Sequence, residues 1–232
     1  MIKKLLPSLG TLIFMVASAF AGPCIPGTLQ DYVNLGSTGC DVSGATFSPF
    51  LVLPGQSFAI PIDPSAIAVT PVGGAYNPGL QFGINVSADP GELFESFFRF
   101  TVTGQLMGAS LLLGPGTATG DGQAIAVEEL CADGAFGGNE PSGCSGIADT
   151  AITFRTESDA FLSDPKVLSG SFFDVFVDIT IDGGLAGTAS LDNITTQFDL
   201  AVTEPEPVPE PSTGILLAGG IALLGLLRRR KK

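Results

Sequence analysis

Short apolar runs fill the middle of the chain, and glycine, proline or aspartate interrupts them every eight to twelve residues. In the clearest run, Phe173, Val175, Val177 and Ile179 fall on one face and more polar residues fall on the other. Alternation with a period of two is typical of a half-buried β-strand. The runs predicted to form strands are 46–53, 57–62, 66–72, 80–87, 97–104, 110–113, 124–130, 151–156, 172–181, 187–191 and 194–202.

Many short strands without a long helical pattern predict an all-β ectodomain, folded as an antiparallel β-sandwich over residues 22–202. A helical period is present only weakly, at residues 29–35. The 17 phenylalanines are the predicted filling of the core. Because lysine is rare, we expect aspartate to supply the charge that blocks pairing at the sheet edges.

The N-terminal end has the three parts of a secretory signal peptide. Two lysines precede an apolar stretch, residues 5–20, and Ala19 and Ala21 form the small-x-small pattern that signal peptidase cuts. Cleavage after Ala21 leaves Gly22 as the first mature residue. A lipoprotein site at Cys24 is not expected, because the glycine and proline before it fit such a site poorly.

The C-terminal end combines a linker, an apolar run and a basic cluster. Alternating prolines in residues 203–212 predict an extended polyproline II spacer. Residues 213–227 are uncharged and predict a short transmembrane helix of about 22 Å, which is less than the roughly 30 Å of a bilayer core. Snorkelling basic residues can extend this span, and positive charge stays on the cytoplasmic side. These membrane-stop residues are Arg228, Arg229, Arg230, Lys231 and Lys232.

The order of these parts resembles the PEP-CTERM sorting signal of Gram-negative bacteria, with Pro209, Glu210, Pro211 and Ser212 as the motif. The resemblance implies recognition by an exosortase, a membrane-embedded cysteine protease, and cleavage near this motif. A permanent single-span anchor on a proline-rich stalk is the alternative. Other stretches are similar to the ectodomains of PEP-CTERM proteins, which supports the β fold and adds no site. They are 28–36, 39–40, 46–50, 68–72, 78–82 and 182–191.

Charge and cysteine usage narrow the class of protein. The net charge of residues 22–212 is near −20, because all 23 carboxylates but only three of the ten basic side chains lie there. Such a surface repels nucleic acid and anionic lipid. Four cysteines in an exported chain predict two disulfides. Three pairings exist, and short glycine-rich loops favour Cys24–Cys40 and Cys131–Cys144.

No catalytic residue, metal ligand or cofactor site is predicted. The chain lacks histidine, which excludes Ser-His-Asp, Cys-His and His-metal sites. A carboxylate pair for glycoside hydrolysis remains open, but no spacing selects two acids. Asp174, Asp178 and Asp182 share a strand face and could bind Ca²⁺, although a solvated polar face is the preferred interpretation. Asp121 and Asp133 precede glycines and predict turns.

These features predict an exported, non-enzymatic surface or matrix protein. Its expected partners are signal peptidase, exosortase, the membrane and exopolysaccharide. Before processing it would be anchored in the inner membrane with a periplasmic ectodomain, and afterwards it would lie at the cell surface or in the extracellular matrix. The alternative is a permanently anchored periplasmic module that binds glycan or calcium, and a carboxylate-based hydrolase is a third hypothesis.

Overall fold

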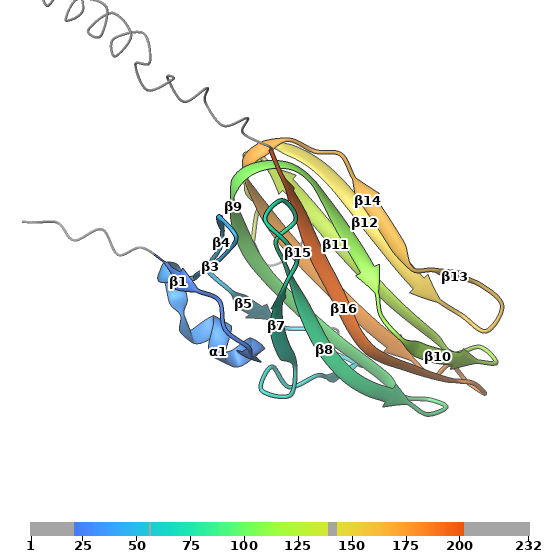
Figure 1. Cartoon of the computed structure of the whole chain (residues 1–232). Coiled ribbons are helices and arrows are strands. Elements are labelled where there is room, and N and C mark those ends of the chain that lie inside the picture. The colour runs from blue at the N-terminus through green and yellow to red at the C-terminus, as the bar shows by residue number, and fades with distance from the viewer. Residues whose placement is uncertain (1–20, 56, 139–142, 202–232) are drawn as a thin grey trace, which may run out of the picture. The chain divides into compact units, whose positions relative to one another are not determined.

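The computed structural model describes residues 21–201, except 56 and 139–142, and within them it places one hydrogen-bonded sheet of 16 strands. Most neighbouring strands are antiparallel, and β1–β3 and β6–β9 are parallel pairs (Figure 1). Helix α1 (Leu29–Asn34) and a 3₁₀ helix (Gly36–Thr38) lie near the start. The strands are β1 (Gly22–Pro23), β2 (Gly27–Thr28), β3 (Cys40–Val42), β4 (Ala45–Phe47), β5 (Leu51–Leu53), β6 (Ile60–Pro61), β7 (Ala68–Val72), β8 (Gly79–Ala88), β9 (Leu93–Leu113), β10 (Gly116–Thr119), β11 (Gln123–Ala132), β12 (Ile147–Arg155), β13 (Ala160–Phe161), β14 (Ser163–Lys166), β15 (Gly170–Asp182) and β16 (Thr188–Leu200).

Strand β9 organises the sheet, because it pairs with six other strands. Its first half, residues 93–103, has β15 on one side and β4, β5 and β6 on the other. Its second half, residues 106–113, lies between β16 and β14. Register shifts near Leu106 bend the strand without ending it. One strand therefore passes from one part of the sheet to another.

The bend at β9 divides the sheet into two layers, as in a β-sandwich. The first layer contains β12, β11, β15 and the first half of β9; the second contains the second half of β9, β16, β8 and β7. Aromatic rings join the layers. Phe82 on β8 lies 4.7 Å from Phe98 on β9, and Phe198 on β16 lies 6.2 Å from Phe173 on β15, measured between ring centroids. The core is thus the space between the layers.

The alternation of the sequence decides which side chains enter this core. On β15 the buried residues are Phe173, Val175, Val177 and Ile179, which confirms the face predicted for this strand. The phenylalanines supply much of the volume, as expected. Those among the largest fully buried side chains are Phe47, Phe50, Phe82, Phe98, Phe100, Phe173 and Phe198.

The segment before β5 covers one side of the core. Helix α1 begins with a capping box, in which Thr28 and Asp31 each bond the other's backbone amide. Its buried residues are Leu29 and Tyr32, and the Tyr32 ring packs edge-on against Phe50, with ring centroids 5.2 Å apart. The weak helical period at residues 29–35 therefore marked a real, although short, helix.

Two disulfides join the cysteines in the pairing expected from the sequence. Cys24–Cys40 ties the chain after β1 to β3, and Cys131–Cys144 ties the end of β11 to the segment before β12. Bridges that close loops of this length are worth about 3 kcal/mol each in the chain-entropy model. The N-terminal edge and the chain between β11 and β12 are thus both covalently fixed.

The sheet edge at β12 uses aspartate for protection, as predicted. The Asp164 carboxylate accepts a hydrogen bond of 2.8 Å from the backbone N–H of Ile152 on β12, and Lys166 lies 3.1 Å from the same carboxylate. An occupied N–H cannot pair with a strand from another molecule. Asp164 therefore blocks part of an otherwise open edge.

Several predicted boundaries are wrong. The runs 97–104 and 110–113 form one strand, β9, and 187–191 and 194–202 form one strand, β16. Register shifts mark both interruptions, with an extra residue at position 107 of β9 and with Ile84 and Asn85 of β8 opposite the single residue Asp192, and neither ends the pairing. Gly108 lies so close to the Lys166 carbonyl of β14 that a Cβ atom would not fit, so this glycine serves sheet pairing rather than a turn.

The targeting segments fall largely beyond the described part of the chain. These are the signal peptide up to residue 20, the Pro/Glu linker from residue 203, the transmembrane run 213–227 and the basic cluster 228–232. Among the described residues, none of the helices has the length and apolar character needed to cross a membrane.

Candidate functional site

The two predicted sorting sites lie in sequence before the first described strand and after the last. Gly22, the predicted first mature residue, begins β1 and pairs with Cys40 of β3. At the other end, β16 finishes at Leu200, nine residues before Pro209. Ala19 and the motif Pro209–Ser212 lie outside the described residues. Removal of either targeting segment at its predicted site leaves every strand intact.

The outer face of the first layer carries an ion pair between two strands. Arg99 on β9 and Asp174 on β15 form a two-pronged ion pair, in which the Nε–Oδ1 distance is 2.7 Å. The Asp174 carboxylate also accepts a bond of 2.9 Å from the Phe136 backbone N–H, and Arg99 donates to the carbonyls of Phe136 and Gly138. The pair thus fastens the segment that follows β11 onto the sheet.

Asp174 therefore does not belong to a solvated polar face, and that interpretation of the three spaced aspartates was wrong. Its carboxylate is almost fully buried, and it is balanced by Arg99. Asp182 accepts a bond of 2.8 Å from the Gly184 N–H within a turn. Asp178 has a third environment, so the three carboxylates do not converge. Among the described residues, no group of three or more His, Cys, Asp or Glu side chains could hold a metal ion.

Asp178 and Glu95 are the carboxylates that come closest to a catalytic pair. They lie diagonally on β15 and β9, because Asp178 is opposite Phe97 and Glu95 is opposite Thr180. Burial, and then repulsion by Glu95, raise the pKa of Asp178 to about 6, and the Thr180 hydroxyl opposes the rise. A raised pKa beside a second acid is the arrangement that a general acid uses.

Access to this pair argues against hydrolysis of a polymer. Glu95 is 5% exposed and lines a cavity of about 330 Å³ whose other walls include Val52, Leu53 and Ile62. The backbone of Gly55 lies so close to the Glu95 carboxylate that an added Cβ would collide with it. A glycosidic bond needs one carboxyl on each side of it. The covered Glu95 side chain offers no such room.

Replacing Asp178 with asparagine should therefore act on stability. The folded pKa is raised above its ordinary value of 3.8 to about 6, so the stability that this group contributes is complete below pH 3.8 and is lost as the pH rises to 6. Asp178→Asn should raise the melting temperature at pH 7 and change little at pH 3.5. Thermal melts at both pH values measure this. An equal gain at both would show that ionisation of Asp178 is not the cause.

Asp121 and Asp133 are turn residues, as predicted. Asp121 accepts hydrogen bonds from the backbone amides of Leu185 and Ala186, at 2.8 and 2.9 Å. Asp133 has a positive φ of 49° and accepts bonds of 2.7 Å from the amide and the hydroxyl of Ser171. These donors hold the pKa of both carboxyls below its usual value, because they favour the charged form.

Sequence reasoning missed Glu128, an acid buried between the two layers. It is fully buried on β11, and within the described residues neither of its oxygens has a hydrogen-bond partner. Burial raises its pKa to about 8. Thr153 on β12 and Thr196 on β16 also bury unpaired hydroxyls. The alternation of β11 contained the signal, because Glu128 shares its face with Ala124 and Ala126.

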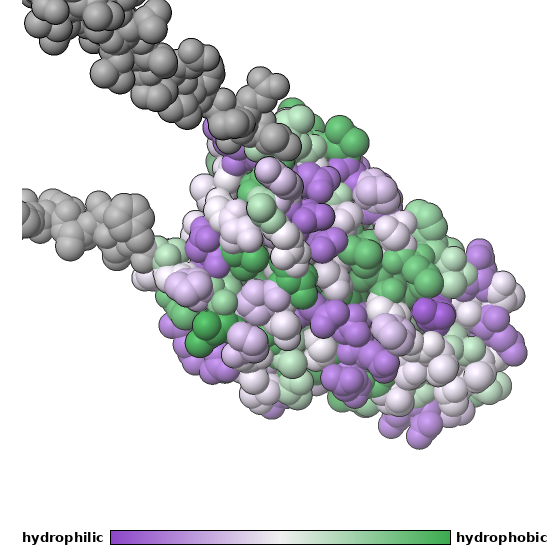
Figure 2. Space-filling view, in the orientation of Figure 1, coloured by the Kyte–Doolittle hydropathy of each residue, from purple (hydrophilic) through white to green (hydrophobic). Residues whose placement is uncertain are grey.

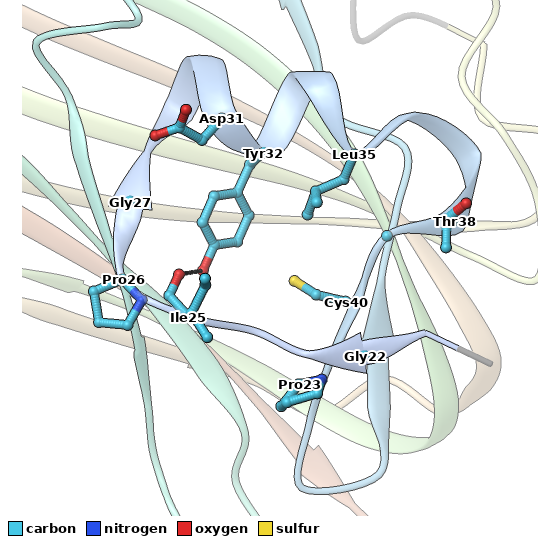
Figure 3. A pocket seen from close by; sticks show the side chains of 11 residues that line it. Gly22, Pro23, Ile25, Pro26, Gly27, Asp31, Tyr32, Leu35, Thr38 and Cys40 are labelled. Atoms are coloured by element: carbon cyan, nitrogen blue, oxygen red, sulfur yellow. Dashed lines mark hydrogen bonds between the residues drawn. The ribbon is translucent and has the colours of Figure 1, made fainter. Parts of the chain in front are cut away.

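A hollow beside the first disulfide has a volume of about 530 Å³. Figure 3 shows its walls: the Tyr32 ring and Leu35 from the helical segment, Ile25 and Pro26 from the segment before the helix, and Cys40. Ligand pockets usually have volumes of roughly 300–1,000 Å³ with a few convergent polar groups. The volume of the cavity therefore fits a small molecule. Its polar side chains determine whether the cavity could bind such a molecule specifically or act on it.

The Tyr32 hydroxyl and the Asp31 carboxylate of this cavity are already hydrogen-bonded within the protein. The Tyr32 hydroxyl donates a hydrogen bond of 3.0 Å to the Ile25 carbonyl, and burial raises its pKa to about 12 (Figure 3). Asp31 caps α1 through Thr28, which lowers the pKa of its carboxyl. No nucleophile with an adjacent base lines the cavity among the described residues. The side chains around the hollow pack the N-terminal segment together, and they do not have the arrangement of a catalytic site.

Comparison with solved structures gives only distant likenesses. One is the enzymatically active domain of tailspike protein 4 of bacteriophage CBA120, at 12% identity and a TM-score of 0.27, with 71% of this chain and 21% of that chain covered. The chain thus spans about a fifth of that structure. The other is TmCBM61 in complex with β-1,4-galactotriose, at 14% identity and a TM-score of 0.25, with 73% and 97% covered. Curated proteins give no match.

The comparison with protein families gives a result at the C-terminal end. Residues 207–231 match the model of the PEP-CTERM protein-sorting motif. They include Pro209, Glu210, Pro211 and Ser212, the apolar run and most of the basic cluster, which are the parts that carried the resemblance. Such a motif implies export and exosortase-dependent processing at the membrane. The protein therefore carries a PEP-CTERM sorting signal on an all-β domain.

Proposed function

We propose that this protein is an exported, non-enzymatic component of the cell surface or extracellular matrix. Its tail is recognised and cut by an exosortase, and its β domain associates with exopolysaccharide or the envelope. The observation that carries this proposal is the match of residues 207–231 to the sorting motif. A sorting signal marks the chain as the substrate of a processing enzyme, and the cargo is the domain that precedes it.

The boundary between sheet and signal supports this reading. The last strand, β16, ends at Leu200, and the motif begins at residue 207. The alternating prolines at 205, 207, 209 and 211 favour an extended polyproline II backbone, which a protease can bind without unfolding the domain. Cleavage at residues 209–212 would release the sheet whole, with both disulfides inside the released part.

The chemistry of the domain favours a cargo over an enzyme. Arg99 compensates the buried Asp174, Glu95 is covered, and Glu128 is sealed between the layers. Localisation follows from processing. The signal peptide directs the chain through the inner membrane, the tail holds it there with a periplasmic domain, and cleavage sends the domain to the surface or matrix. An uncut tail would instead give a permanently anchored periplasmic glycan-binding module.

Tail processing is measured by intact mass and C-terminal peptide mapping of the protein from its native host. We expect a C-terminus between Val208 and Thr213, because the exosortase acts near the motif. The double variant Glu210→Ala/Pro211→Ala should stay uncut. Glu204→Ala/Pro205→Ala changes the same residue types outside the matched residues and should be processed normally. A wild-type C-terminus at Lys232 would overturn the proposal.

A further inference from the structure

The two outer faces of the sheet differ in charge. On the first layer, β9, β15 and β11 present Glu95, Arg99, Asp174, Asp178 and Glu129. On the second layer, β7, β8, β10 and residues 108–113 of β9 contain no charged residue at all, and β16 carries Asp192 opposite the bulge of β8 and Asp199 near its end. A chain with a net charge of −13 thus keeps one broad face almost neutral.

Amide and hydroxyl side chains cover this neutral face. Gln81 lies outward on β8, since Leu80 and Phe82 are buried, and Thr195 and Gln197 lie outward on β16, since Ile194, Thr196 and Phe198 are buried. Figure 2 views the layer from outside, with purple and pale residues over β8 and β16. We call this surface the amide–hydroxyl face. Its defining residues are Thr70, Gln81, Ser110, Asn193, Thr195 and Gln197.

The register places these groups in rows. Thr70, Gln81, Thr195 and Leu112 are consecutive partners across β7, β8, β16 and β9. Strands lie about 4.8 Å apart, so this row is about 15 Å long. Along β16, Asn193, Thr195 and Gln197 repeat at about 6.7 Å, the spacing of alternate residues. The face is therefore a regular array and not a scatter of polar residues.

Most of the array has hydrogen-bonding capacity to spare. Gln81 donates to Asn193 at 3.3 Å. Within the part of the chain that the structure describes, the side chains of Thr70, Ser110, Thr195 and Gln197 make no hydrogen bond to protein, so they are open to a ligand. Hydroxyl and amide groups both donate and accept, as the hydroxyls of a sugar do. The face matches an uncharged, hydroxyl-rich polymer.

We infer that the amide–hydroxyl face binds a strand of neutral polysaccharide, which rests on the proposed association with exopolysaccharide and names the surface and the ligand class. Charge selects the ligand. An anionic polymer is repelled by a chain of this charge, and a cation would be drawn to the carboxylates of the first layer. A neutral glycan loses nothing to repulsion and gains hydrogen bonds along the rows.

The chemistry also sets the length of the ligand. Single hydrogen bonds to exposed groups contribute little, so a short oligosaccharide should bind weakly. A long strand that engages several rows converts weak contacts into avidity. Binding should therefore require a polymer, and a trisaccharide fraction of the same glycan should compete poorly.

The test is affinity electrophoresis of the protein as processed by its host, with the host exopolysaccharide separated by ion exchange into neutral and anionic fractions. Wild-type protein should be retarded by the neutral fraction and not by the anionic one. Thr70→Val/Thr195→Val keeps shape and strand propensity but removes two hydroxyls, and it should weaken binding roughly tenfold. Thr101→Val/Thr180→Val makes the same change on the first layer and should bind as wild type.

Each other outcome overturns the inference. The first is that the neutral fraction does not retard the protein, and the second is that the anionic fraction retards it more strongly. The third is that the two double variants lose the same binding affinity while their melting temperatures match. The C-terminus of the same preparation, read by mass spectrometry, separates the two claims. A terminus between Val208 and Thr213 without retardation leaves the sorting proposal intact and removes the polysaccharide face. A terminus at Lys232 with retardation by the neutral fraction removes the sorting proposal and leaves the polysaccharide face intact.

Discussion

Glu128→Gln should stabilise the protein by about 3 kcal/mol at pH 7, because each unit between the ordinary carboxyl pKa and the raised one costs about 1.4 kcal/mol. The ordinary value is 4.5 and burial raises the pKa of Glu128 to about 8. At neutral pH the folded chain must hold a proton that the unfolded chain releases. Glutamine has nearly the same shape and needs no proton, so it removes this cost.

The pH dependence of the free energy of unfolding tests whether the raised pKa of Glu128 is the cause of this stabilisation. A pKa that is higher in the folded state gives stability that is complete below pH 4.5 and is lost as the pH rises to 8. Urea unfolding of wild-type protein should show this fall, and Glu128→Gln should flatten it. The difference between the two proteins should grow from near zero at pH 4.5 to about 5 kcal/mol at pH 8.

The neighbouring acid provides the control. Glu129 points to the outer face, where it accepts a hydrogen bond of 2.6 Å from the Thr150 hydroxyl. Glu129→Gln makes the same chemical change one residue away and should keep the fall in stability that wild-type protein shows. A Glu128→Gln protein that is less stable than wild type at pH 8 would contradict the buried, proton-bearing carboxyl.

Arg99→Ala should destabilise the protein by about 3–5 kcal/mol, the usual cost of leaving a buried charge uncompensated. Asp174 is 3% exposed and would keep the Phe136 N–H as a donor while losing both contacts to the guanidinium. The carbonyls of Phe136 and Gly138 would lose their donor as well. Chemical unfolding measures the stability, and limited proteolysis reports on the segment between β11 and β12.

Two further variants separate the charge from the packing. Arg99→Ala/Asp174→Asn removes both charges and should recover part of the loss, because the remaining amide is cheaper to bury. Lys166→Ala breaks the ion pair with Asp164 at the sheet edge, where partly exposed charges contribute less than about 1 kcal/mol. Equal losses in Arg99→Ala and Lys166→Ala would show that burial of Asp174 does not set the cost.

Local pattern was sufficient for much of the fold. The alternation in β15 identified the buried face, the weak helical period at residues 29–35 marked the site of α1, and the short loops between cysteines indicated both disulfides. Each of these depends on residues that are near one another in the chain. The sorting motif at residues 207–231 is local for the same reason, since a protease reads it as a linear segment.

Pairing between distant residues could not be predicted. Nothing near Asp174 indicates that Arg99, 75 residues earlier, neutralises it, and so the spaced aspartates were interpreted as solvated. The two halves of β9 pair with different partner strands, and so do the two halves of β16. A prediction based on turn residues therefore divided each of them into two strands. The amide–hydroxyl face likewise exists only after β7, β8, β16 and β9 are side by side.

The position of β16 has a consequence for how the protein is made. This last strand fills the centre of the second layer, between β8 and both β9 and β10, with partners that are translated about a hundred residues earlier. Until residue 200 emerges from the translocon, those partners present unpaired backbone to any neighbour, the state in which nascent β proteins aggregate. The second layer can therefore close only after the chain up to residue 200 has been made. A premature stop before β16 would leave β8, β10 and the second half of β9 without this partner strand.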